Sequence, residues 1–316
     1  MAAAFTFLLA ALTVIGTGAA AQPSATASAP EPPPVSCIVD NPVDVGSGFR
    51  LRRGKFTTID HPDADLETAA YGVNNRGQIV GGYDKAGIVH AFLLDRGRYK
   101  TIDFPGATRS NAARINARGQ ILGNYEDARG GCHGYLLKNG RFKTIDVPGA
   151  PTMPFGLNDR GQIAGTYFDA QGLRHGFVLD KGVYTTIDVP GAVQTAIGDI
   201  NNRGQVLGTY LDAQGAFHTF LSEGDAFPTI DDIPGATLTA PIGINNRGHV
   251  AGFSIDANQV RHGFLLKNGT FTTIDHPLAS DDSQAHDLND RGEIVGFYER
   301  PAGSRSQGSA QHQTFR

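Results

Sequence analysis

Short runs of alternating apolar and polar residues follow one another along most of the chain, and turn residues separate them. Between residues 68 and 103 there are four such runs, at 68–74, 78–83, 88–94 and 99–102. The turns between them read Asn-Arg-Gly, Asp-Lys-Ala-Gly and Arg-Gly, in which glycine can take a positive φ. No segment has the spacing of an amphipathic helix. The pattern therefore predicts a unit of four antiparallel strands.

This unit recurs with a period of about 43 residues. The tripeptide Thr-Ile-Asp returns six times, ending at Asp60, Asp103, Asp146, Asp188, Asp231 and Asp275. The turn Asn-x-Arg-Gly also returns six times, with its glycine at Gly77, Gly119, Gly161, Gly204, Gly248 and Gly292. Four strands at this period have the size of a propeller blade. We predict an all-β, six-bladed β-propeller of four-stranded blades; the alternative is an open β-repeat solenoid, which needs a shorter rung.

The two ends of the repeat region carry complementary halves of one unit. Residues 48–60 align without a gap with residues 134–146 and supply only a third and a fourth strand. Residues 286–298 supply only a first and a second strand. Pairing these halves in one shared blade closes the ring and removes exposed strand edges. We therefore predict five whole blades and a sixth that the two ends share.

The segments outside the repeats differ in composition. Residues 1–21 are apolar and small and end in three alanines, which is typical of a secretory signal peptide cleaved before Gln22. A membrane anchor is the alternative, but the apolar run is shorter than the roughly 20 residues of a span. Residues 22–46 form an Ala/Pro/Ser-rich linker and lead-in, 47–300 the propeller, and 301–316 a flexible tail, although 312–315 resemble the start of a third strand. We expect a secreted protein, extracellular or periplasmic, with no membrane span after cleavage.

Charge and cysteine content bear on the class of binding partner and on the compartment in which the protein works. With 27 basic and 31 acidic residues the net charge is −4, which gives no electrostatic footprint for nucleic acid. The two cysteines, Cys37 and Cys132, fit an oxidising compartment. Because a closed ring places Cys132 two blades away from the strand that follows Cys37, we expect no bridge between them. We expect a monomer, and the sequence does not identify a cofactor.

Recurring tripeptides carry a family resemblance. His-Ala-Phe at 90–92 returns as His-Gly-Phe at 175–177 and 262–264. Together with Asn-x-Arg-Gly-Gln-Ile and Thr-Ile-Asp-x-Pro-Gly, it resembles the bacterial extracellular repeat family named for that tripeptide, the HAF repeat. The resemblance covers residues 48 to about 300. It implies an exported β-repeat protein and no particular reaction.

Residues present in every copy are expected to serve the blade. Five histidines share one register in the third strands: His90, His133, His175, His218 and His262. Equivalent residues of a six-bladed ring lie too far apart to bind one ion at about 2 Å, so we expect a hydrogen bond within each blade and no metal site. The aspartates of Thr-Ile-Asp and the arginines of Asn-x-Arg-Gly have the same status. We find no nucleophile elbow, zinc-binding helix motif or phosphate loop and predict no catalytic residues.

Positions at which the copies differ are better candidates for function. Two residues before the turn asparagine, glycine and charge alternate: Gly72, Arg114, Gly156, Asp199, Gly243 and Asp287. Because the first strand of a propeller blade lines the central channel, the three charged side chains should converge there. The predicted ligand-binding residues are Arg114, Asp199 and Asp287, with His286, Asn111, Gln284 and Tyr71 as polar neighbours. A salt-bridged plug that fills the channel is the alternative, and the pattern favours it.

These observations predict a secreted, non-catalytic binding or scaffold propeller. It would present a variable loop face and a polar central channel to an unidentified extracellular ligand or protein. The alternatives are a hydrolase or lyase with its site at the channel mouth, and a purely structural spacer. An enzyme should carry a carboxylate or histidine with a perturbed pKa in a concave pocket.

Overall fold

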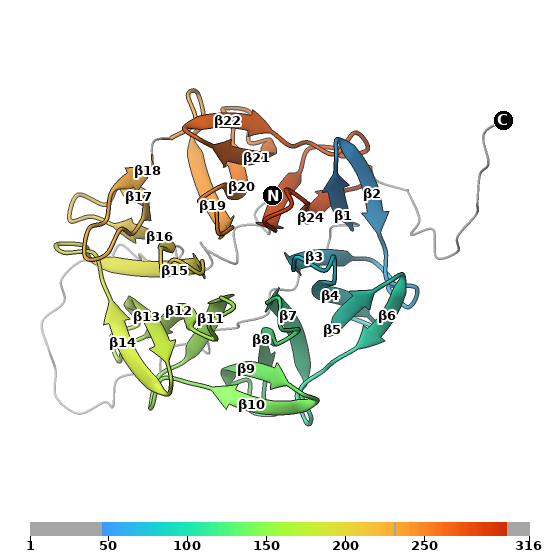
Figure 1. The fold of residues 1–316 in the computed structure, drawn as a ribbon, viewed down its shortest axis with the longest axis horizontal. Coiled ribbons are helices and arrows are strands. Elements are labelled where there is room, and N and C mark those ends of the chain that lie inside the picture. The colour runs from blue at the N-terminus through green and yellow to red at the C-terminus, as the bar shows by residue number, and fades with distance from the viewer. Residues whose placement is uncertain (1–45, 231, 302–316) are drawn as a thin grey trace, which may run out of the picture.

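The computed structural model describes residues 46–230 and 232–301, which form a closed ring of six four-stranded antiparallel sheets (Figure 1). This is the predicted six-bladed β-propeller, and the ring excludes the open solenoid. In the part of the chain that the structure describes, no helix is long and apolar enough to cross a membrane. The predictions of a signal peptide, a linker and a tail concern residues outside these ranges, apart from Gly46 and Pro301 at their ends.

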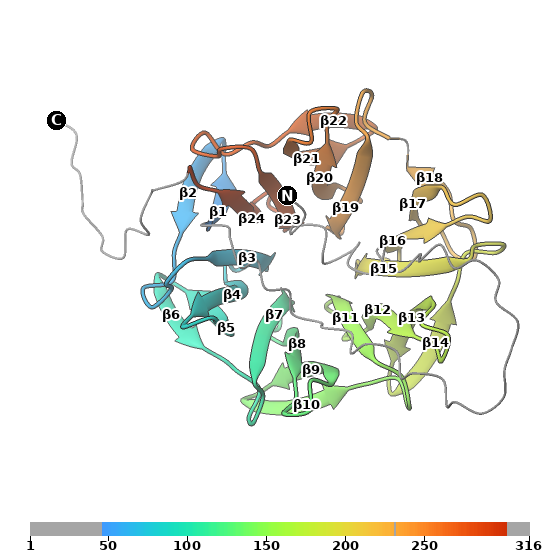
Figure 2. The same ribbon diagram turned by 180° about the vertical axis from the view of Figure 1, so that it is seen from behind.

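Each blade has four strands, counted from the channel outward, and blade 6 combines the two ends of the described chain (Figures 1 and 2). The first strands of blades 1 to 6 are β3 Thr68–Val73, β7 Arg109–Ile115, β11 Thr152–Leu157, β15 Gln194–Ile200, β19 Leu238–Ile244 and β23 Ser283–Leu288. The second strands are β4 Ile79–Lys85, β8 Ile121–Glu126, β12 Ile163–Phe168, β16 Val206–Leu211, β20 Val250–Ile255 and β24 Ile294–Glu299. The third strands are β5 Ile88–Asp95, β9 Cys132–Lys138, β13 Arg174–Asp180, β17 Phe217–Leu221, β21 Arg261–Lys267 and β1 Gly46–Arg52. The fourth strands are β6 Arg98–Thr101, β10 Arg141–Ile145, β14 Val183–Ile187, β18 Thr229–Ile230, β22 Thr270–Thr273 and β2 Lys55–Ile59.

The antiparallel order gives the ring two distinct faces. The first strand of each blade ends in the Asn-x-Arg-Gly turn, and the hairpin between the third and fourth strands lies on the same side. We call this side the turn face. The linkers between blades and the turns between the second and third strands lie on the opposite side, which we call the linker face.

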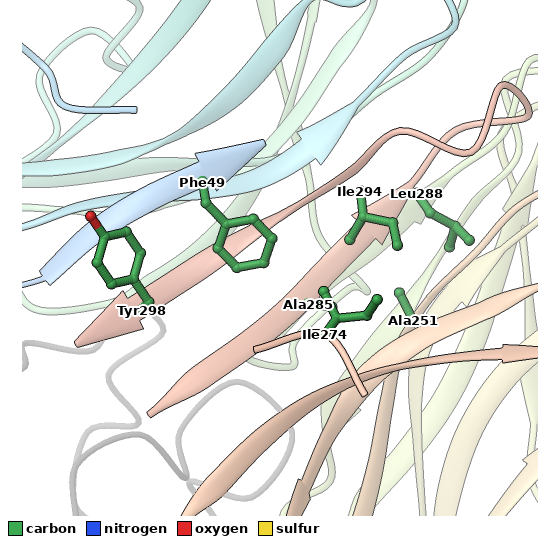
Figure 3. Close-up of a cluster of buried hydrophobic side chains, with 7 residues drawn as sticks. All are labelled: Phe49, Ala251, Ile274, Ala285, Leu288, Ile294 and Tyr298. Carbon is green, nitrogen blue, oxygen red and sulfur yellow. The ribbon is translucent and has the colours of Figure 1, made fainter. Parts of the chain in front are cut away.

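The shared blade closes the ring as predicted. β1 pairs with β24 over six residue pairs, from Gly46↔Glu299 to Leu51↔Ile294. Phe49 of β1 is fully buried and packs with Leu288, Ile294 and Tyr298 of blade 6 and with blade 5 residues (Figure 3). A side chain from the start of the described chain therefore completes the core between the last two blades.

The aromatic residue of each His-Ala-Phe-type tripeptide is buried in the hydrophobic core. The six equivalent rings are at most 2% exposed: Phe49, Phe92, Tyr135, Phe177, Phe220 and Phe264. A glycine in the second strand makes room for each ring. A Cβ on Gly81 would lie 2.9 Å from the Phe92 ring, and one on Gly296 would lie 2.8 Å from Phe49. The repeated Gly and Phe are thus one packing unit.

The histidine of the tripeptide binds the aspartate of Thr-Ile-Asp. His90 Nδ1 lies 2.7 Å from Asp103 Oδ2, and Asp103 Oδ1 accepts the N–H of Ala91 at 2.8 Å. The same histidine–aspartate pair occurs in blades 2, 3 and 5. In blade 4 the equivalent His218 bonds through Nε2 to Asp212 of the neighbouring turn. The expectation of a hydrogen bond within each blade is therefore confirmed for these five histidines.

Cys132, at the start of β9, is disulfide-bonded. The sequence has one other cysteine, Cys37, which lies outside the described residues. The expectation that these cysteines stay unpaired was therefore wrong. Counting blades took no account of the reach of the chain, since eight residues separate Cys37 from β1 and such a segment could span roughly 30 Å if extended.

A circuit of asparagine side chains joins all six blades at the turn face. Each turn asparagine accepts two backbone N–H groups of its own turn with Oδ1, as Asn158 does from Arg160 and Gln162 at 3.0 Å. Its Nδ2 donates to the carbonyl oxygen of the turn asparagine in the next blade. The last of these bonds runs from Asn289 to Asn74 at 3.0 Å and closes the circuit.

Replacing one member of this circuit should destabilise the ring. Asn158→Ala removes four hydrogen bonds of a buried side chain, so we expect a loss of about 3 kcal/mol in the free energy of unfolding. Urea denaturation measures the loss. Gln171→Ala, at an exposed turn position, is the control and should cost less than about 0.5 kcal/mol. Equal effects of the two substitutions would contradict the role of the circuit.

Candidate functional site

A β-bulge interrupts the first strand of every blade at the same position. The register of first and second strands shifts between Ala70 and Gly72 in blade 1, and at the equivalent place in the other five blades. The extra residues are Tyr71, Ala113, Phe155, Gly198, Ile242 and His286. A bulge leaves the extra residue out of the ladder and bends the strand. It therefore changes the direction of the next side chain, which is the position where glycine and charge alternate.

Close approach of neighbouring blades explains the alternation. A Cβ on Gly72 would lie 2.9 Å from the Ala113 carbonyl oxygen and 3.0 Å from the Arg114 Cα. Gly156 is equally close to Asp199, and Gly243 to Asp287. Each glycine thus admits the backbone of the next blade, whose charged side chain projects into the channel. The six blades form three pairs around the channel.

The two aspartates join their own blade to the following one. Asp199 accepts the N–H of Ile200 at 2.8 Å and that of Ile244, in blade 5, at 3.0 Å. Asp287 accepts the N–H of Leu288 at 2.8 Å and that of Val73, in blade 1, at 2.8 Å. Both carboxylates are nearly inaccessible, at 4% and 6% exposure. They are inter-blade contacts as well as channel charges.

Burial changes the protonation of these carboxyl groups. It raises the pKa of Asp287 to about 7, with a further increase from Asp199 that Arg114 and the backbone hydrogen bonds oppose. Burial also raises the pKa of Asp199, again opposed by Arg114. Near neutral pH the channel therefore contains a carboxyl group close to its titration point.

Arg114 crosses the channel and neutralises part of this charge. Its Nε lies 3.5 Å from Asp199 Oδ2. Its Nη atoms donate to carbonyl oxygens of bulge residues, namely Tyr71 at 2.9 Å, Ala113 at 3.0 Å, Ile242 at 2.9 Å and His286 at 3.4 Å. The bulges expose these carbonyl oxygens, and the guanidinium group binds four of them. Arg114 is thus a cross-brace as well as a charge.

The other four residues predicted to bind a ligand lie apart from Arg114, Asp199 and Asp287. Tyr71 and His286 are bulge residues whose rings are 5.3 Å apart, and burial lowers the pKa of His286 to about 4. Gln284 donates to both carboxylate oxygens of Asp282 at 3.0 Å. Asn111 Oδ1 accepts the N–H of Asn124 at 3.2 Å. These four side chains precede the charged position on their strands, toward the linker face, and do not line the cavity described next.

A cavity of about 70 Å³ occupies the centre of the turn face, enough for several water molecules. Every blade lines it with three residues, the turn asparagine and its two neighbours. The side chains of Arg114, Asp199 and Asp287 complete the lining on the channel side. We call this cavity the cup.

The rim of the cup consists of the residue after each turn asparagine. These six half-buried residues are Asn75, Ala117, Asp159, Asn202, Asn246 and Asp290. Their backbone N–H groups donate to the rim side chain of the next blade, from Ala117 round to Asp290 and Asn75. Ala117 has no side-chain acceptor, so the rim circuit is interrupted between blades 1 and 2.

Two opposite carboxylates give the rim its charge. Asp159 in blade 3 accepts the Asn202 amide at 2.7 Å. Asp290 in blade 6 accepts the amides of Asn75 and Asn246 at 2.8 Å. Burial raises the pKa of Asp290, but these hydrogen bonds and the nearby Arg247 lower it by more, to below its ordinary value. Asp290 therefore stays ionised.

Comparing the six copies at the residue directly after the turn asparagine would have identified the rim from the sequence. The sequence prediction rested on the residues two places before the turn asparagine and missed the residue directly after it. That position carries three kinds of side chain in six copies, which is the same signal of divergence. The bulge that aims the charged position was not visible, because it depends on pairing with the second strand.

The fold is similar to known propeller structures. No model of a known protein family matches the sequence, and no curated protein matches it. The fold is similar to that of putative TolB from Agrobacterium tumefaciens, with a TM-score of 0.62, 15% identity, and 82% of this chain and 99% of that chain covered. TolB from Acinetobacter baumannii gives a TM-score of 0.54 at 14% identity, over 82% of this chain and 65% of that one. The chain thus spans about two thirds of the second protein, and the likeness establishes the fold.

The raised pKa of Asp287 predicts a pH-dependent stability. An unfolded aspartate titrates near pH ~3.9, so the folded protein binds this proton more tightly. Protonated Asp287 therefore contributes to the free energy of unfolding. This contribution is complete below about pH 4 and is lost as the pH rises to about 7. Asp287→Asn cannot ionise. We expect its free energy of unfolding, relative to the wild type, to increase by roughly 2–4 kcal/mol between these pH values.

Urea denaturation at pH values from 4 to 8 measures this difference. The buried His276 and His286, whose pKa values are lowered to about 4, contribute with the opposite sign in both proteins and cancel. Asp225→Asn, at an exposed position of the turn face, is the matched control and should give a flat difference. A flat difference for Asp287→Asn as well would mean that Asp287 ionises normally.

Proposed function

We propose that this protein is an exported, non-catalytic binding propeller whose ligand site is the cup. The observation that carries the proposal is the divergence of the blades at the cup. The turn asparagines and the aromatic core residues repeat, whereas the cup lining differs between blades in charge and hydrogen-bonding groups. Closure of the ring alone does not require these differences between blades.

The chemistry of the cup favours a ligand with cationic or hydrogen-donating groups. Asp159 and Asp290 are on the rim, and Asp199 and Asp287 lie below them. Arg114 supplies the one basic side chain of the lining. Every oxygen of the four aspartates already accepts a hydrogen bond, and a carboxylate oxygen can accept a second from a ligand. Recognition would come from hydrogen bonds and charge, since most of the residues that line the cup are polar or charged.

Export and family membership belong to the same proposal. The apolar segment 1–21 and the Ala/Pro/Ser-rich segment 22–46 support cleavage and release. The disulfide at Cys132 supports an oxidising compartment, because such bonds persist there. The His-Ala-Phe-type tripeptides support membership of the HAF repeat family. We expect the exported protein to act as a monomer.

An enzyme remains the second candidate, and one observation favours it. Asp287 lies in the cup with a pKa raised to about 7, as a general acid or base would. Against this, each of its oxygens accepts a backbone N–H, and the side chain is 6% exposed. These contacts give it a structural task that a proton-transfer role does not need. A hydrolase or lyase is therefore less well supported than a binding module.

A thermal-shift screen tests the cup as a binding site. Divalent cations, polyamines, amino acids, monosaccharides and disaccharides are compared on the wild type, Asp159→Asn and Asp225→Asn. A cup ligand at about 100 times its Kd should raise the melting temperature of the wild type by roughly 5 °C. The shift should fall by at least half in Asp159→Asn and persist in Asp225→Asn, which changes an exposed charge of the same face. Equal shifts in all three proteins would place the binding elsewhere.

N-terminal sequencing of the protein from its native host tests export. The expected mature protein begins at or near Gln22 and lies outside the cytosol. Cys132 should be unreactive toward thiol reagents until the protein is reduced. Recovery of the intact N-terminus from the cytosol would contradict export, and the cup would then be tested against intracellular ligands.

A further inference from the structure

Six arginines surround the mouth of the cup on the turn face. One follows each turn asparagine by two residues, and all six are exposed: Arg76, Arg118, Arg160, Arg203, Arg247 and Arg291. We call these six residues the arginine crown. The turn uses only their backbone, because each N–H donates to Oδ1 of the turn asparagine.

The guanidinium groups of the crown make few hydrogen bonds or ion pairs with the described part of the chain. Arg203 Nε donates to the Asn246 carbonyl oxygen at 3.0 Å. Within residues 46–230 and 232–301, no hydrogen bond or ion pair engages the other five guanidinium groups. The expectation that an arginine present in every copy serves its blade is therefore wrong for these five. An exposed charge that is repeated six times, and whose guanidinium group makes a hydrogen bond within the described residues only at Arg203, indicates a role at the surface.

Most other exposed charges of the turn face are also positive, the exceptions being Glu223 and Asp225 in the blade 4 hairpin. The hairpins between third and fourth strands add exposed basic residues at its periphery: Arg53, Arg96, Lys138, Lys181 and Lys267. The linker face carries aspartates of the Thr-Ile-Asp tripeptides, namely Asp60, Asp103, Asp146, Asp188 and Asp275, and aspartates of the turns between second and third strands, such as Asp127 and Asp169. The net charge of −4 thus conceals a basic face and an acidic face.

The crown lacks the features of a protein or single-stranded nucleic-acid interface. Protein interfaces centre on buried apolar or aromatic anchors, and single-stranded nucleic acids stack on aromatic rings. Among the described residues the most exposed aromatic side chain is Phe217, at the start of β17 on the linker face. Of the strongly exposed large hydrophobic residues, Val183 alone is near the turn face, at the start of the outer strand β14. Recognition at the crown would rest on charge and guanidinium hydrogen bonds.

We infer that the arginine crown binds an anionic polysaccharide through its carboxylate or sulfate groups. The planar guanidinium fork matches both groups bidentately. Six such forks on a ring offer a repeating anionic chain several contacts at once. This inference goes beyond the proposed function, because the crown and the cup are made of different residues and take groups of opposite charge.

Two charge-matched triple variants test the inference. Arg76→Gln, Arg160→Gln and Arg247→Gln remove the crown charge of alternate blades. Lys85→Gln, Arg129→Gln and Lys143→Gln remove three exposed charges elsewhere. Binding of polygalacturonate and of heparin is measured by biolayer interferometry at about 50 and 300 mM NaCl. At the lower salt concentration the crown triple should lose about tenfold or more in affinity, with a shallower salt dependence, and the control triple less than about twofold.

Each outcome decides the inference. A preference of the wild type for polygalacturonate or heparin identifies the carboxylate or the sulfate as the recognised group. Equal losses in both triples would mean that overall charge alone attracts the polymer and would overturn the crown as a site. Equal affinity for single-stranded DNA of matched length, or no binding of either polysaccharide by the wild type, would also overturn it. Asp159→Asn should weaken binding at the cup but should bind the polysaccharides at least as tightly as the wild type, because it removes a negative charge next to Arg160. Failure of the cup and failure of the crown are therefore distinguishable.

Discussion

The turn asparagine couples local and global structure in one side chain. Its Oδ1 accepts two N–H groups of its own turn, and its Nδ2 donates to the next blade. An aspartate would supply the acceptor but not the donor, so asparagine is needed in every copy. The bond from Asn289 to Asn74 joins the last blade to the first, beside the strand pairing of β1 with β24. Forming a turn and closing the ring are therefore the same interaction.

This circuit also determines where the blades are free to differ. The asparagine is fixed, and so is the glycine that admits the aromatic ring of the core. The residue after the asparagine faces the cup, and the residue two places before it faces the channel. Side chains at these positions meet across the axis rather than within a blade. Divergence there changes the chemistry of the centre without changing the blade.

The sequence left open whether the three charged channel residues form a ligand-binding site or a salt-bridged plug, and the structure combines features of both. Asp199, Asp287 and Arg114 do close the channel and bind the backbone of neighbouring blades, as a plug would. The same three side chains also line the cup on its inner side. The buried carboxyl groups destabilise the ring when ionised, because burial raises their pKa values. Arg114 offsets this cost and makes the cluster compatible with a closed ring.

The sequence by itself determined the fold, because a blade is a local object. Its strands, turns and core residues lie within about 43 residues, and the complementary halves at 48–60 and 286–298 imply closure. The sequence also identified Arg114, Asp199 and Asp287, since divergence among copies is visible by alignment. Only the tertiary structure decided what these residues do. The bulges, the contact of Gly72 with blade 2 and the six-residue rim arise between blades. The ring of exposed crown arginines and the separation of charge onto two faces likewise follow from the positions of all six blades around one axis, which no single repeat contains.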